Sequence, residues 1–170
     1  VPDGGQGILM AGPSNATWSR KRAEGFKDQV ASEHDNLEIV ASPTSLVDPG
    51  EALTKFNNAL SASPDIKWIA SVDYSLPVPQ SIPERYKGLP YVTMGFDPNL
   101  KEAVGNGLVN STLPTDAYYM GYVGVGTVVS LLNGDTADKF NCQPFSPAIT
   151  KENLDSPFVE RQLYPEGFKA

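Results

Sequence analysis

The stretch that decides the fold reads Gly7-Ile8-Leu9-Met10-Ala11-Gly12-Pro13-Ser14-Asn15-Ala16-Thr17-Trp18-Ser19-Arg20-Lys21-Arg22-Ala23-Glu24-Gly25-Phe26. Its apolar run from Ile8 to Ala11 has the length of a strand that is buried on both faces. A polar turn follows at residues 12–15, where Gly and Pro break the strand and Ser or Asn can cap a helix. Apolar residues then recur at helical spacing, at Trp18, Ala23, Phe26 and Val30. Strand, tight turn and amphipathic helix form the beginning of a βα unit.

The same alternation continues along the chain. Further apolar strands are predicted at residues 37–41, 66–72, 90–96, 108–113 and 144–150, and helices after Asp48-Pro49, at 99–105 and at 117–133. The segment 75–88 contains three prolines and predicts an irregular loop with one helical turn near 82–86. Strands that alternate with helices imply βαβ crossovers, so we predict an α/β fold built on a parallel sheet.

Composition excludes several function classes. A net charge of −7 and a pI near 4.6 disfavour nucleic acid as a partner, because phosphate binding needs clustered Lys and Arg. No apolar run reaches the roughly 18 residues of a membrane-spanning helix. One cysteine, Cys142, and one histidine, His34, allow no internal disulfide and disfavour a metal site. We therefore expect no metal.

Sequence motifs of catalysis are missing as well. There is neither a Gly-x-Ser-x-Gly elbow nor a phosphate-binding Walker loop. The glycines at 121, 124 and 126 lie within a predicted helix, whereas a dinucleotide fingerprint needs a strand–turn–helix setting. The sequence thus predicts no enzyme, no catalytic residue and no cofactor.

Polar side chains instead follow the predicted strands. Trp18 and Arg20 follow the first strand, Asp73 the third, Asp97 the fourth, and Thr115 with Asp116 the fifth. Carboxyl ends of parallel strands meet at one edge of a sheet, so these residues would converge there. Arginine, carboxylates and an aromatic plane suit a small polar or polyhydroxyl ligand. Each also has a structural alternative: Asp97 before Pro98 fits a helix cap, Trp18 a core residue and Arg20 a solvated helix residue.

In order and spacing, these motifs resemble the carboxyl-terminal half of a type I periplasmic solute-binding protein of the ribose-binding class. The resemblance rests on Arg20-x-Arg22-Ala23-Glu24-Gly25-Phe26, Asp73, Gly95-Phe96-Asp97, the segment 112–121 with Pro114-Thr115-Asp116 and Met120-Gly121, and the segment 147–155. It implies a Rossmann-like, three-layer α/β/α lobe. It also implies ligand contacts at Arg20, Asp73, Asp97 and Thr115, although Thr115 replaces the usual Gln.

The resemblance further implies an exported, periplasmic protein that binds a sugar, polyol or similar solute and delivers it to a membrane transporter or sensor. A narrower resemblance, to the TorT-like partners of a sensor kinase for trimethylamine N-oxide, rests on Gly12-Pro13 with Trp18 and on the tail 165–169. The retained Phe96-Asp97 keeps a sugar slightly ahead of a methylamine oxide. A third alternative is the effector domain of a LacI-type transcription regulator, which a preceding helix-turn-helix would reveal.

Family members have two lobes. By analogy, residues 1–113 would form the carboxyl-terminal ligand-binding lobe. Residues 114–143, with their strongly apolar helix, would belong to an amino-terminal lobe that is missing from this chain. Residues 144–170 would return to the first unit as a strand and a tail.

Overall fold

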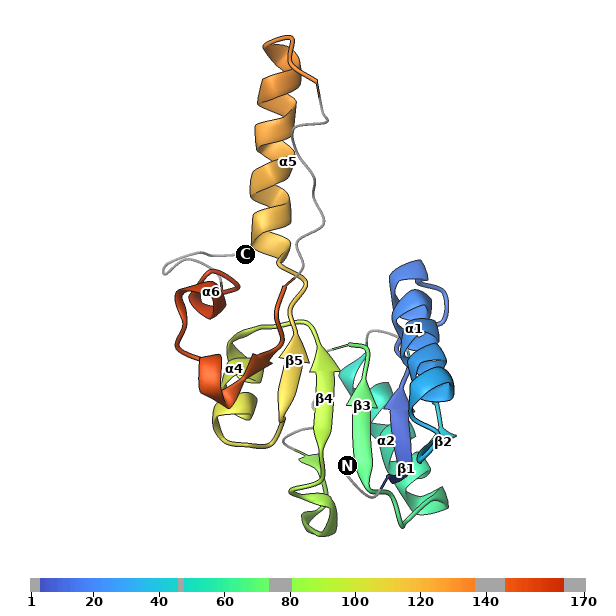
Figure 1. The fold of residues 1–170 in the computed structure, drawn as a ribbon. Helices are drawn as coiled ribbons and strands as arrows, with labels where there is room; N and C mark the ends of the chain where they lie inside the picture. The colour runs from blue at the N-terminus through green and yellow to red at the C-terminus, as the bar shows by residue number, and fades with distance from the viewer. Residues whose placement is uncertain (1–3, 46–47, 74–80, 137–145, 164–170) are drawn as a thin grey trace.

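The expected alternation of strands and helices is confirmed in the computed structural model, which describes residues 4–45, 48–73, 81–136 and 146–163 (Figure 1). The elements are β1 (Gly5–Met10), α1 (Thr17–Glu33), β2 (Leu37–Ala41), α2 (Pro49–Ala62), β3 (Trp68–Ser71), η1 (Glu84–Tyr86), β4 (Tyr91–Met94), α4 (Pro98–Gly105), β5 (Ser111–Leu113), α5 (Ala117–Leu132), β6 (Ile149–Thr150), η3 (Lys151–Asn153) and α6 (Pro157–Glu160). The helical turn predicted near 82–86 is present as η1. Cys142 and the tail 165–169 lie outside the described residues.

One mostly parallel sheet carries the fold, with the strand order β2-β1-β3-β4-β5-β6. The last strand departs from the prediction: β6 is short, and it pairs antiparallel with β5, with Ile149 opposite Thr112. A parallel neighbour would need a crossover that returns the chain to the amino ends of the strands. β6 instead begins opposite Thr112, in the middle of β5, and ends opposite Ser111, the first residue of β5. It therefore runs antiparallel to β5.

The sheet is covered on both faces because its strands are apolar on both. In β1, Ile8 and Met10 join a core formed with α2, η1 and α4, whereas Leu9 joins a second core on the face that α1 covers. The first core contains Phe56, Leu60, Tyr86, Tyr91, Leu100 and Val104. The chain therefore has the three layers that the family resemblance implies.

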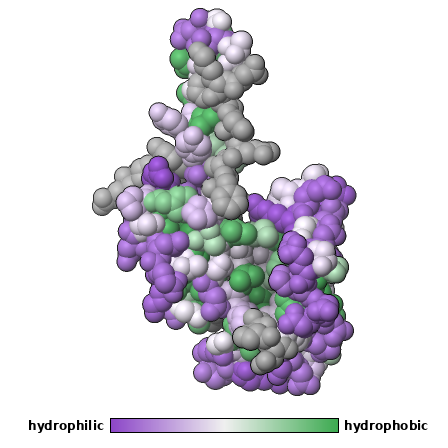
Figure 2. Space-filling view, viewed as in Figure 1, coloured by the Kyte–Doolittle hydropathy of each residue, from purple (hydrophilic) through white to green (hydrophobic). Residues whose placement is uncertain are grey.

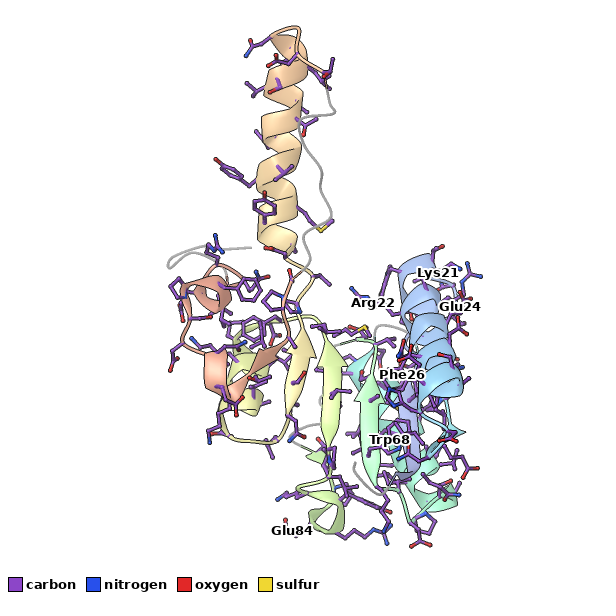
Figure 3. All side chains as sticks on the ribbon, viewed as in Figure 1. Lys21, Arg22, Glu24, Phe26, Trp68 and Glu84 are labelled. Atoms are coloured by element: carbon purple, nitrogen blue, oxygen red, sulfur yellow. The ribbon has the colours of Figure 1, made fainter. Side chains whose placement is uncertain are left out.

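The side chain of Trp68 lies against the backbone of β1 within the second core. The Trp68 Nε1 donates a 2.9 Å hydrogen bond to the Gly5 carbonyl, and the Trp68 ring lies 5.9 Å from that of Phe26 (Figure 3). A Cβ atom added to Gly7 would lie 2.0 Å from Cδ2 of the Trp68 ring. Glycine at position 7 is thus required by the close approach of an aromatic ring.

On the α1 side, the cover of the sheet is incomplete. A cavity of about 230 Å³ lies beside α1 over β3, β4 and β5, lined by Phe26, Ala70, Ser71, Val92, Thr93, Met94, Ser111 and Leu113. Val92 and Leu113 are 38% and 45% exposed. Figure 2 shows hydrophobic surface in this region, bordered by hydrophilic side chains.

Helix α5 continues beyond the carboxyl ends of the strands instead of lying on the sheet (Figure 1). It contains no charged residue. Many of its apolar side chains are exposed: Tyr119, Met120, Tyr122, Val125, Val128, Val129, Leu131 and Leu132. No helix among the described residues is long and apolar enough to cross a membrane.

Candidate ligand-binding site

A tight turn brings the first turn of α1 to the carboxyl ends of the strands. Gly12 has a φ of +64°, and the buried Ser19 donates a 2.6 Å hydrogen bond from Oγ to the Ala11 carbonyl. The residue before α1 is Ala16, so neither Ser14 nor Asn15 caps the helix as its N-cap residue. The Ser19 hydroxyl and the backbone of Gly12 therefore fix where α1 begins.

Arg22 reaches from α1 to the end of β3 (Figure 3). Its Nη1 donates a 3.0 Å hydrogen bond to the carbonyl of Val72, directly after β3. Its guanidinium carbon lies 4.9 Å from the centroid of the Trp18 ring. Burial lowers the pKa of Arg22, and the nearby Asp73 carboxylate acts in the opposite direction. An arginine side chain keeps its positive charge in a protein.

The other predicted arginine, Arg20, is exposed on α1. Its charge acts on Glu24, whose pKa is lowered mainly by Lys21 and in smaller part by Arg20. Lys21 and Glu24 form an exposed ion pair on the side of the helix away from the sheet (Figure 3). The family resemblance implies a ligand contact at Arg20, whereas the arginine that lies at the end of β3 in the structure is Arg22. The sequence gives a reason to consider Arg22 as well, because it lies four residues after Trp18 and residues four apart share a helix face.

Asp73 is buried at the end of β3, where hydrogen bonds hold its backbone. The Ser71 Oγ donates to the Asp73 carbonyl at 2.6 Å, and the Thr93 Oγ1 donates to the same oxygen at 3.4 Å. The hydroxyl of Tyr91 is hydrogen-bonded to Ser71, while burial raises the pKa of Tyr91. Three strand residues therefore fix the position of Asp73 near Arg22.

Asp97 follows β4 and caps α4: its Oδ1 accepts a 2.7 Å hydrogen bond from the Leu100 amide. The turn before it is held by Thr112, whose Oγ1 donates a 2.5 Å hydrogen bond to the Gly95 carbonyl. The alternative of a helix cap is therefore confirmed for Asp97.

Thr115 and Asp116 lie between β5 and α5. Thr115 is exposed. Asp116 has a φ of +50° and is the only non-glycine with positive φ among the residues described. This left-handed conformation costs energy for a non-glycine residue and turns the chain from the sheet into α5.

The described residues contain no cluster of His, Cys, Asp and Glu that could hold a metal ion.

A family model described as the periplasmic binding protein domain matches residues 1–136. This chain belongs to the periplasmic binding protein family. Its fold is that of a type I periplasmic binding protein lobe, which confirms the predicted fold class. A search of curated proteins found no match.

Solved periplasmic binding proteins share the fold. A solute-binding protein from Agrobacterium vitis with bound D-fucose is 24% identical, with a TM-score of 0.80, and the match covers 96% of this chain and 58% of that one. One from Agrobacterium radiobacter in complex with D-arabinose is 22% identical, with a TM-score of 0.79, and the match covers 92% and 54%. Another from Agrobacterium vitis, bound with α-D-tagatopyranose, is 19% identical, with a TM-score of 0.78 and coverage of 98% and 56%. This chain matches little more than half the length of these proteins.

Proposed function

We propose that this chain is the carboxyl-terminal lobe of a two-lobed solute-binding protein that binds a sugar or a similar small polar ligand without converting it. The observation that carries the proposal is the charged Arg22, held next to the buried Asp73 at the carboxyl edge of the sheet. Asp97 and Thr115 follow the neighbouring strands at the same edge, where open α/β sheets bind ligands.

The chemistry of the site favours a sugar over a methylamine oxide. Ionised Asp97 only accepts hydrogen bonds, so a ligand that meets it must donate one. A sugar hydroxyl donates to a carboxylate and accepts from a guanidinium, whereas trimethylamine N-oxide has an acceptor oxygen and no donor. The bound D-fucose, D-arabinose and tagatopyranose of the similar proteins support the same ligand class.

Solute-binding proteins of this family work outside the cytoplasmic membrane, and we propose the same location here. The similar proteins named above include ABC transporter solute-binding proteins, which supports delivery of the ligand to a transporter permease. Two further partners remain alternatives. The TorT-like resemblance would replace the transporter by a sensor kinase, and an effector domain of a LacI-type regulator would act on transcription.

We further propose the division of the chain into lobes. Residues 1–113 would form the carboxyl-terminal lobe, and residues 114–143 would pack in the amino-terminal lobe. Residues 144–170 would return to the carboxyl-terminal lobe as a strand and a tail. The direction of α5, its exposed apolar surface and the matched half of the similar proteins support this division. A helix without charges on any side is suited to burial between other elements.

An NMR titration of the 170-residue chain tests the binding function. D-Arabinose or D-fucose is expected to shift the amide resonances of the β1–α1 turn and of the residues around Val72 and Asp97. The expected Kd is roughly 1 mM, a binding free energy of about −4 kcal/mol, because one lobe supplies half of the contacts. Shifts with trimethylamine N-oxide alone would favour the sensor alternative. No shift with any of these compounds, or conversion of one to a product, would contradict the proposal.

Replacing Asp97 separates its cap from its proposed ligand contact. Asp97→Ala is expected to lower the free energy of unfolding by about 1 kcal/mol through the lost cap and also to remove the sugar-induced shifts. Asp48→Ala is a matched control, because the Asp48 Oδ1 caps α2 by accepting a 2.7 Å hydrogen bond from the Glu51 amide in another Asp-Pro sequence. Equal binding by both variants would restrict Asp97 to its cap.

The exposed surface of α5 predicts self-association of the isolated chain. Sedimentation is expected to give a mass that rises with concentration, because an apolar surface of this kind leaves water when it meets another. Val125 is 68% exposed, and Val125→Lys is expected to reduce the effect, while Gln29→Lys on the exposed side of α1 is not. A monomer at every concentration with α5 still exposed would count against the division into lobes.

A further inference from the structure

We infer that Trp18 is a positioning residue: its indole ring holds the Arg22 guanidinium at the strand ends before any ligand arrives. The inference rests on the proposed function, because it explains how the same site is prepared for binding.

Two anchors from different elements fix Arg22. The Trp18 ring lies one helical turn before Arg22 on α1, 4.9 Å from the guanidinium carbon. The Val72 carbonyl, which follows β3, accepts the hydrogen bond from Nη1 at 3.0 Å. A cation–π contact with one element and a hydrogen bond to the carbonyl of another together restrict where the guanidinium lies. The guanidinium carries five N–H donors, and Nη1 provides the one bound to Val72.

The surroundings of Trp18 support a role other than core packing. Its side chain is 42% exposed, whereas Trp68 is 5% exposed and hydrogen-bonded inside the second core. The buried residues of α1 are Ser19, Ala23 and Val30, and Phe26 packs against Trp68 of the second core. An indole as exposed as that of Trp18 contributes little to the hydrophobic core. Its ring face instead contacts the Arg22 guanidinium.

Pre-ordering matters because a free arginine side chain loses many rotamers when it binds. Stacking of a cation on an indole corresponds to a change in affinity of about 2-fold to 30-fold, and the larger value applies as the cation is shielded from water. Phenylalanine offers a weaker aromatic face of the same kind, whereas leucine offers none.

The first experiment needs no ligand. In the unsubstituted chain, the indole ring current is expected to shift the Arg22 side-chain proton resonances upfield. The shift should persist in reduced form in Trp18→Phe, disappear in Trp18→Leu and stay unchanged in Arg20→Gln. The only other tryptophan is Trp68, so its fluorescence checks that each Trp18 variant is folded. Arg22 resonances that are the same in Trp18→Leu as in the unsubstituted chain would overturn the inference.

The second experiment titrates the same variants with D-arabinose. Trp18→Leu is expected to weaken binding by about 5-fold to 30-fold, and Trp18→Phe to restore most of the loss. Equal affinities of the Leu and Phe variants would overturn the positioning role. If the unsubstituted chain binds no sugar while the Arg22 resonances respond as expected, the proposed function fails and the positioning of Arg22 by Trp18 stands.

Discussion

Gly7→Ala is expected to lower the free energy of unfolding by about 3 kcal/mol or more, the upper end of the usual cost of overpacking. The new Cβ would lie 2.0 Å from Cδ2, 2.1 Å from Cε2 and 2.4 Å from Cε3 of Trp68. The ring cannot move aside easily, because Nε1 is bonded to the Gly5 carbonyl and Phe26 packs against it. Either the ring or β1 must shift; Trp68 belongs to the second core, and β1 contributes residues to both cores.

Chemical denaturation measures this cost, and Gly25→Ala is its control. Gly25 lies within α1, and no atom lies within 4 Å of its added Cβ. Alanine there is expected to raise the free energy of unfolding by about 0.5 to 1 kcal/mol, because glycine is a poor helix former. Equal stabilities of the two variants would show that Trp68 does not restrict position 7.

Arg22→Gln is expected to abolish the sugar-induced shifts of the chain. Glutamine keeps part of the length but loses the charge, the planar fork and the stacking on Trp18. The variant also removes the positive charge next to the Val72 carbonyl and the Asp73 carboxylate. Removing a charged hydrogen-bond partner costs about 1.5 to 3 kcal/mol, which is enough to move a millimolar Kd beyond detection.

Arg20→Gln is the matched control for Arg22→Gln, since both remove one positive charge from α1. It is expected to leave the titration unchanged, because Arg20 is exposed and its charge acts on Glu24. Loss of binding in the Arg20 variant, with binding kept in the Arg22 variant, would contradict the role proposed for Arg22 and favour the Arg20 contact that the family resemblance implies.

The sequence determined the features that depend on local pattern. Alternating apolar strands and amphipathic helices specify the α/β order, because burial of each element depends on its own periodicity. Both Asp-Pro sequences predicted helix starts, and Asp48 and Asp97 do cap α2 and α4. The absence of charge in α5 was equally visible. Asp73 and Asp97 were placed at the strand ends by position alone.

Only the tertiary structure decided which side chains meet. Arg20 and Arg22 differ by two positions in one motif, yet the Val72 carbonyl and the Trp18 ring lie only within reach of Arg22. Gly7 is required by a ring that comes from β3, and the direction of β6 follows from where the returning chain joins the edge strand. The Trp18–Arg22 contact follows from helical spacing, but the others join residues far apart in the sequence. Local periodicity cannot specify them, because the free energy that selects each one arises only when separate elements pack together.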